Sequence, residues 1–205
     1  MKKLPAKISR HLVAEEAARL LCYGLVEEYK EAKEKAAAAL GESLLPSNIE
    51  IAHEVDKLAD EIEGPSRKEL LVALRKEALK IMRVLSEFQP RLIGSVWRGT
   101  CHKGSDIDII VFSFEPNVII DALKHNGYAK FKTEWKSKLE NGEMNTFLHI
   151  HLFQEPAMDI EVVVNDPSRF GKMEKCEIYG DLKTGLTIPQ LRLILEKDPT
   201  KDFLP

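Results

Sequence analysis

Two pairs of residues in the middle of the chain have the types and the spacing needed for chemistry. Gly94-Ser95 is followed, after ten residues, by Asp106-Ile107-Asp108. A glycine lets the backbone approach a ligand closely, and Ser95 adds a hydroxyl and an amide that could contact a phosphate. Asp106 and Asp108 project from one face of a strand, because successive side chains point to opposite faces. The pattern predicts a site that binds a nucleoside triphosphate through divalent metal.

The two aspartates suit magnesium. Carboxylates two positions apart on a strand lie about 7 Å from each other, a spacing that can hold two metal ions about 4 Å apart. Magnesium commonly binds one or two carboxylates together with substrate phosphates, and manganese accepts similar oxygen ligands. Without a cation, the two like charges would raise each other's pKa. We therefore expect two Mg²⁺ ions, with Mn²⁺ as an alternative, at Asp106 and Asp108.

Small and positively charged residues around these pairs are candidates for holding the triphosphate. Arg98 and Lys103 can supply charge for the leaving pyrophosphate, and Gly104-Ser105 turns the chain into the acidic strand. Trp97 could stack on a base or ribose, but packing beneath the phosphate-binding turn is favoured. The expected nucleotide-binding residues are Gly94, Ser95, Arg98, Lys103 and Ser105.

The first 90 residues have a helical pattern. Residues 15–40, rich in alanine, glutamate and lysine, predict one helix that ends at Gly41. A capping box of Ser47 with Glu50 opens a second helix, which runs to Gly64. Ser66 with Glu69 predicts the same start for a third helix, which ends before Pro90.

Strands dominate after Pro90. We expect strands at 91–93, 107–114, 130–139, 144–153 and 158–164, and helices at 118–125 and 187–197. A hairpin loop longer than two residues is expected around Asn141-Gly142, and a tail at the end of the chain. The pattern predicts an α/β (α+β) fold with a mixed sheet flanked by helices. Residues 1–64 would form an N-terminal helical region and residues 65–205 the sheet-bearing domain.

Composition describes an ordinary globular protein. Of the 205 residues, 44% are hydrophobic and 31% are charged. No apolar run approaches the roughly 20 residues of a membrane span, and the start lacks the apolar core of a secretion signal. The three cysteines are far apart, which fits a reducing cytoplasm. A net charge of −3 excludes a global basic field for nucleic acid.

The residues Leu92 to Thr100, continued by Ser105 to Val111, resemble the nucleotidyltransferases of the polymerase-beta superfamily. The resemblance is greatest to small archaeal and minimal prokaryotic members, including the nucleotidyltransferase head of archaeal CCA-adding enzymes. It implies a polymerase-beta-like sheet in a nucleotidyltransferase domain at 65–205. It also implies transfer of a nucleoside monophosphate, with ATP favoured as the donor, to an acceptor hydroxyl with release of pyrophosphate.

The same family needs a third carboxylate on a neighbouring strand. Asp159 and Glu161 have the same parity in the run that ends at Val164, so both face one side. Glu161 is the preferred candidate and Asp159 the second. In the mechanism that the resemblance implies, Asp106, Asp108 and Glu161 hold the metals, and the third carboxylate can also take the proton of the attacking hydroxyl.

The sequence leaves the identity of the acceptor open. An RNA end, a protein side chain or a small molecule would all provide a hydroxyl. The alternative function is a nucleotide-binding, antitoxin-like module that pairs with a helical protein partner or with a second copy of itself.

Two other groups of residues have two interpretations each. His149 and His151 share a strand face and could bind metal, but packed histidines are favoured because no further ligand spacing supports zinc. Four lysines along one expected strand could form a basic face that guides an RNA acceptor. The favoured interpretation is a solvated face whose charges discourage pairing with the strand edge of another molecule. These lysines are Lys130, Lys132, Lys136 and Lys138.

Overall fold

The structure is a computed structural model that describes residues 6–140, 142–154 and 158–205. The chain divides into two compact units. The helical unit comprises residues 1–67 with 175–181 and residue 205. The sheet unit comprises residues 68–174 and 182–204. None of the helices in the described ranges is long and apolar enough to cross a membrane.

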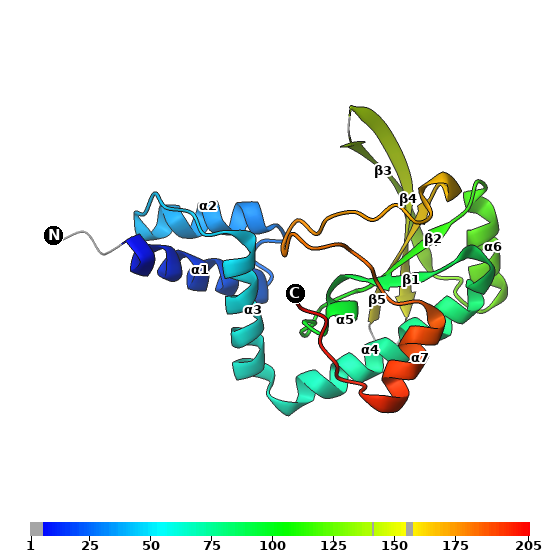
Figure 1. Cartoon of the computed structure of the whole chain (residues 1–205), viewed down its shortest axis with the longest axis horizontal. Helices are drawn as coiled ribbons and strands as arrows, with labels where there is room; N and C mark the ends of the chain where they lie inside the picture. The colour runs from blue at the N-terminus through cyan, green and yellow to red at the C-terminus, as the bar shows by residue number, and fades with distance from the viewer. Residues whose placement is uncertain (1–5, 141, 155–157) are drawn as a thin grey trace. The chain divides into compact units, whose positions relative to one another are not determined.

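The helical unit packs its helices through small side chains. Its core contains many alanines that are almost fully buried, which allows close helix contact. The expected single helix over 15–40 is wrong: the chain breaks after Cys22, where Gly24 adopts a left-handed φ of 64°. The predicted capping box of Ser47 and Glu50 is confirmed. The helices are α1 (Ala6–Cys22), α2 (Tyr29–Leu40) and α3 (Asn48–Glu63), coloured blue to cyan in Figure 1.

The sheet unit contains a five-stranded sheet in the order β1-β2-β5-β4-β3 (Figure 1). The central pair, β2 and β5, is parallel, and the other neighbouring pairs are antiparallel. The predicted mixed sheet is therefore confirmed. The strands are β1 (Arg91–Ile93), β2 (Ile107–Phe112), β3 (Phe131–Glu140), β4 (Glu143–Gln154) and β5 (Met158–Asn165).

One face of this sheet is covered by helices. Apolar side chains of three helices form one buried cluster with alternate residues of the strands. The predicted capping box at Ser66 is wrong, because the helix begins at Pro65 and the Ser66 hydroxyl donates to the Glu63 carbonyl. Proline suits the first turn of a helix, since it lacks the N–H that has no partner there. The three helices are α4 (Pro65–Val84), α6 (Pro116–His125) and α7 (Ile188–Lys197).

Strand alternation decides which residues face the helices. Ile107, Ile109 and Val111 of β2 are fully buried. Asp108 lies between two of these residues and therefore projects from the opposite face, as the sequence predicts. On β5, Ile160, Val162 and Val164 alternate in the same way. The polar face of the sheet, which lies away from the helix-covered core, is thus the one that carries Asp108 and Glu161.

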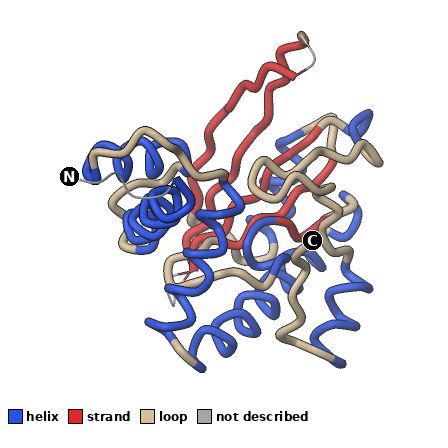
Figure 2. Tube along the Cα trace, turned by 60° about the vertical axis from the view of Figure 1, so that its left-hand side comes forward, coloured by secondary structure: helices blue, strands red, loops and turns tan. Residues whose placement is uncertain are grey.

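The β3–β4 hairpin extends beyond the rest of the sheet (Figure 2). Residues 148–154 of β4 pair with β5, whereas residues 143–147 pair with β3 alone. Pairing continues to Glu140 opposite Glu143, so the longer loop expected around Asn141-Gly142 is wrong. Asn141 itself lies outside the described residues.

The end of the chain is anchored rather than a free tail. Arg75 of α4 is fully buried, and its guanidinium donates to carbonyl oxygens at two places in the sheet unit. These are the carbonyls of Val96 and Trp97, and those of Pro199 and Lys201. The short helix α5 (Gly94–Arg98) is therefore tied to residues 199–201 through one arginine.

Candidate active site

Three carboxylates gather on the polar face of the sheet. Asp106, Asp108 and Glu161 each offer one oxygen, and these oxygens lie within 4.8 Å of one another. Parallel pairing places Asp108 of β2 directly beside Glu161 of β5. Asp159, the second candidate, pairs with Phe153 of β4 and is not a member of this group. Tertiary structure therefore brings together the three acids that were expected as metal ligands.

The surroundings oppose ionisation of the two aspartates. Burial raises the pKa of Asp108 well above its ordinary value, and the charges of Asp106 and Glu161 raise it further. Partial burial also raises the pKa of Asp106, and the charges of Glu161 and Asp159 add to this rise. Three acids that repel one another, of which Asp108 and Glu161 are half-buried, are a suitable donor set for a cation, which would relieve the repulsion.

Gly94 is packed against the Asp108 carboxylate. Antiparallel pairing sets Ile93 opposite Asp108, and the chain then turns at Gly94 with a left-handed φ of 71°. A Cβ added at Gly94 would overlap the carboxylate oxygen of Asp108. Only glycine combines this backbone conformation with room for the acid.

Replacement of Gly94 by alanine is expected to lower the activity of this site about 100-fold. The Cβ would displace the Asp108 carboxylate, and the left-handed conformation would cost about 1–2 kcal/mol. Transfer assays and urea denaturation of the variant measure both effects. Gly104→Ala is the matched control, because Gly104 has a φ of 90° but nothing lies within 4 Å of an added Cβ. Equal activity of the two variants would contradict this explanation.

The other expected nucleotide-binding residues lie in different surroundings. Ser95 is the second residue of α5, and Lys103 is exposed in the following loop. The Ser105 hydroxyl accepts a hydrogen bond from the His102 amide at 3.0 Å, so it stabilises the turn before β2. Arg98 is buried, donates to the Phe203 carbonyl and lies over the Trp97 ring. Its guanidinium is thus engaged by the protein, which differs from the expected contact with pyrophosphate.

The sequence interpretation missed Lys183. Leu186, three residues further on, pairs with Leu92 of β1, so this segment runs antiparallel to the strand that leads into Gly94. The positive charge of Lys183 lowers the pKa of Asp108 and so opposes the effect of burial. No local pattern marks this lysine, because it reaches the site through the pairing of segments that are far apart in the sequence.

A hollow of about 430 Å³ lies beside the acidic group. This volume falls within the range of small-molecule sites, roughly 300–1,000 Å³. The hollow extends from Asp106, the residue before β2, across β5 and β4 to β3. Its lining residues are Asp106, Lys132, Glu134, His151, Leu152, Phe153, Asp159, Ile160 and Glu161.

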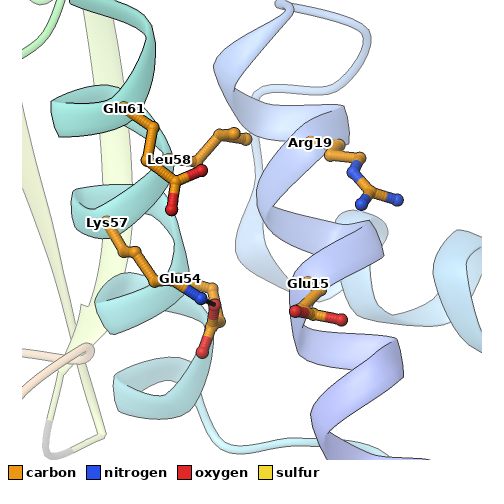
Figure 3. Close-up of a pocket in the computed structure, with 6 residues that line it drawn as sticks. All are labelled: Glu15, Arg19, Glu54, Lys57, Leu58 and Glu61. Atoms are coloured by element: carbon orange, nitrogen blue, oxygen red, sulfur yellow. Dashed lines mark ion pairs between the residues drawn. The ribbon is translucent and has the colours of Figure 1, made fainter.

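A second hollow lies in the helical unit, between α1 and α3 (Figure 3). Its volume is about 70 Å³, which is too small for a nucleotide. Lys57 forms an ion pair with Glu54 at 3.6 Å within it. We therefore place the candidate site in the sheet unit alone.

The two histidines of β4 lie beside Glu161. His149 Nδ1 is 2.8 Å from Glu161 Oε1, and His151 Nε2 is 3.6 Å from the same oxygen. Within the described residues, the acidic group is the one cluster of three or more ligand side chains that could hold a metal, and neither histidine belongs to it. The interpretation as packed histidines therefore agrees with the structure better than a zinc pair.

The mixed sheet, the Gly94 turn and the three carboxylates define a protein of the nucleotidyl-transferring class. The family model described as the nucleotidyltransferase domain matches residues 75–180, just over half of the chain. The chain belongs to this family, which is part of the polymerase-beta superfamily. The match includes the Gly94 turn and all three acids, and it excludes α1, α2 and α3.

Three solved structures illustrate partial similarity to this chain. A cytoplasmic RNA terminal U-transferase is 19% identical over 54% of this chain and 34% of its own, with a TM-score of 0.34. The Cid1 poly(U) polymerase is 17% identical over 56% of this chain and 37% of its own, with a TM-score of 0.34. A chain of a GLD-2/RNP-8 complex is 20% identical over 52% of this chain and 34% of its own, with a TM-score of 0.30. The chain thus spans about a third of the length of these proteins. No curated protein matches the chain.

Proposed function

We propose that the protein is a metal-dependent nucleotidyltransferase that moves a nucleoside monophosphate from a triphosphate, with ATP preferred, to an acceptor hydroxyl. The observation that carries this proposal is the group of three carboxylates within 4.8 Å, formed beside Gly94 in a domain of this family. A merely structural role for these acids fails to explain why three mutually repelling groups are kept together.

The donor set fits divalent magnesium or manganese. Asp106, Asp108 and Glu161 provide carboxylate oxygens only, which these hard cations prefer. When bound, the cations would neutralise the acids and stabilise negative charge on the phosphates and on the attacking oxygen. The missing side chain of Gly94 leaves the Asp108 carboxylate free to occupy its position in this group.

The transfer step forms a bond between the acceptor oxygen and the α-phosphorus. The bond from the α-phosphorus to the bridging oxygen breaks, and pyrophosphate leaves with the bond electrons. Glu161 lies at the edge of the hollow, where it can accept the proton of the hydroxyl. The turn at Gly94-Ser95 follows β1, which pairs with β2 on the side away from Glu161. This turn would hold the triphosphate together with Lys183, whose charge acts on Asp108.

The acceptor binds in the hollow next to Glu161. Sheet order supports this placement, since β1, which leads into the Gly94 turn, pairs with β2, whereas the hollow extends across β5 and β4 to β3. An RNA end, a protein side chain and a small molecule each carry a hydroxyl of the required kind, so the experiment must identify the acceptor class.

The test is incubation of the purified protein with each α-labelled nucleoside triphosphate, Mg²⁺ or Mn²⁺, and a cell extract. A double variant, Asp106→Ala with Asp108→Ala, is treated in parallel. Asp121→Ala serves as the control, because Asp121 is an exposed residue of α6 on the helix-covered side. We expect label to move into one acceptor class with the wild type and the control, and not with the double variant.

Two results would contradict the proposal. Transfer by the double variant would exclude the carboxylates as the metal site. Tight triphosphate binding without label in any acceptor would favour the alternative, a nucleotide-binding module that acts through a partner.

A further inference from the structure

Donor groups from β4 and from the next strand, β3, approach Glu161 of β5. His149 Nδ1 lies 2.8 Å from Glu161 Oε1, His151 Nε2 lies 3.6 Å from it, and Lys136 Nζ lies 3.8 Å from it. All three groups approach the same oxygen of the carboxylate.

Strand register explains why two histidines reach one acid. His151 of β4 is directly opposite Glu161 of β5, and His149 is opposite Val163. Residues two apart on a strand share a face, so His149 approaches Glu161 diagonally. Diagonal neighbours in an antiparallel pair are within reach of long side chains. His149 therefore contacts Glu161 because of the register and not because of their separation in the sequence.

Burial distinguishes His149 from the other two donors. The side chains of His149 and Glu161 are 14% and 18% exposed, whereas those of His151 and Lys136 are 33% and 47% exposed. Lys136 also pairs with Glu134, at 3.6 Å. A hydrogen bond to a carboxylate gains strength as water is excluded. The contact from His149 is the shortest and the least exposed of the three.

A glutamate needs such a contact more than an aspartate does. Its side chain has one more torsion, and fixing it against the other two acids costs conformational entropy. Resting on the function proposed above, we propose that His149 is a positioning residue. Its hydrogen bond to Oε1 holds the Glu161 carboxylate in place as the third metal ligand beside Asp108.

The test measures metal binding in the absence of nucleotide. Mn²⁺ is titrated into the wild type, His149→Ala and His149→Asn, and binding is followed by water-proton relaxation. Losing an outer hydrogen bond to a ligand typically lowers metal affinity about 10–100-fold, and we expect this loss for His149→Ala. Asparagine places an amide N–H near the position of Nδ1, so His149→Asn should recover most of the affinity.

Kinetics and two further variants complete the design. Under saturating metal, kcat of His149→Ala should fall about 10–100-fold while KM for the triphosphate changes less than about twofold. His125→Ala is the matched control, because its ring nitrogen contacts only the Asp121 carbonyl of its own helix among the bonds described. Asp108→Asn reports whether Mn²⁺ binds at the acids.

The outcomes separate the positioning role from the proposed function. If the wild type binds Mn²⁺ no better than Asp108→Asn, the metal site is wrong and the positioning role is overturned with it. If the wild type binds more tightly but His149→Ala binds equally well, only the positioning role is overturned. Equal losses in the alanine and asparagine variants would also overturn it.

Discussion

Replacing Asp108 by asparagine is expected to abolish transfer and, at the same time, to stabilise the metal-free protein. Asparagine keeps the shape of the side chain but removes the charge that would hold the metal. We expect activity to fall by at least about 1,000-fold, more than the usual cost of losing one transition-state donor. The free energy of unfolding should rise by about 0.5–2 kcal/mol, as is common when a strained active site is relieved.

The pH dependence follows from the raised pKa of Asp108. Its ordinary value is 3.8, and burial raises the pKa in the folded protein. As pH rises above the ordinary value, the unfolded state loses its proton before the folded state does. The free energy of unfolding therefore falls until pH passes the folded pKa, and the loss is constant above it. Asp108→Asn lacks this loss. Its free energy of unfolding should therefore exceed that of the wild type only slightly near pH 4, and the difference should grow at higher pH.

Thermal melts with and without Mg²⁺ measure this effect across pH. Metal should raise Tm of the wild type, and more at pH 7.5 than at pH 5, since protons and metal compete for the same oxygens. Metal should raise Tm of Asp108→Asn much less. A metal-free Asp108→Asn variant that melts below the wild type at pH 7.5 would show that the charge of Asp108 is not destabilising.

Among the substitutions proposed here, Arg75→Met is expected to lower the free energy of unfolding the most. The variant removes hydrogen bonds to four carbonyls, two in α5 and two near the end of the chain. Carbonyl groups left without partners in the interior cost about 1–3 kcal/mol each before relaxation, so we expect a total loss of about 3–5 kcal/mol. Transfer should also fall, because α5 begins at the Gly94 turn.

Urea denaturation measures this loss directly. Arg83→Met is the control, since Arg83 is exposed on the same helix and its replacement should change stability by less than about 0.5 kcal/mol. If both variants unfold at the same urea concentration, the carbonyl contacts of Arg75 contribute little, and the end of the chain must be held by other contacts.

Local patterns in the sequence were sufficient to predict most of the elements. Alternation in the run from Ile107 predicted which face Asp108 occupies, because a strand repeats every two residues. The capping box at Ser47 and the cap at Thr187 are also local, since the interacting groups lie three residues apart. The break after Cys22 was missed because helix-forming residues continue on both sides of it.

The sequence by itself was enough to identify the two aspartates and the turn at Gly94 as a candidate site, and to predict a divalent cation as a ligand that they suit. Only the tertiary structure decided that Glu161 joins Asp106 and Asp108, because parallel pairing of β2 with β5 puts Glu161 directly beside Asp108. The same holds for the contacts of His149, Lys183 and Arg98. Each depends on register or packing between segments far apart in the chain, and such pairing leaves no periodic signal in either segment.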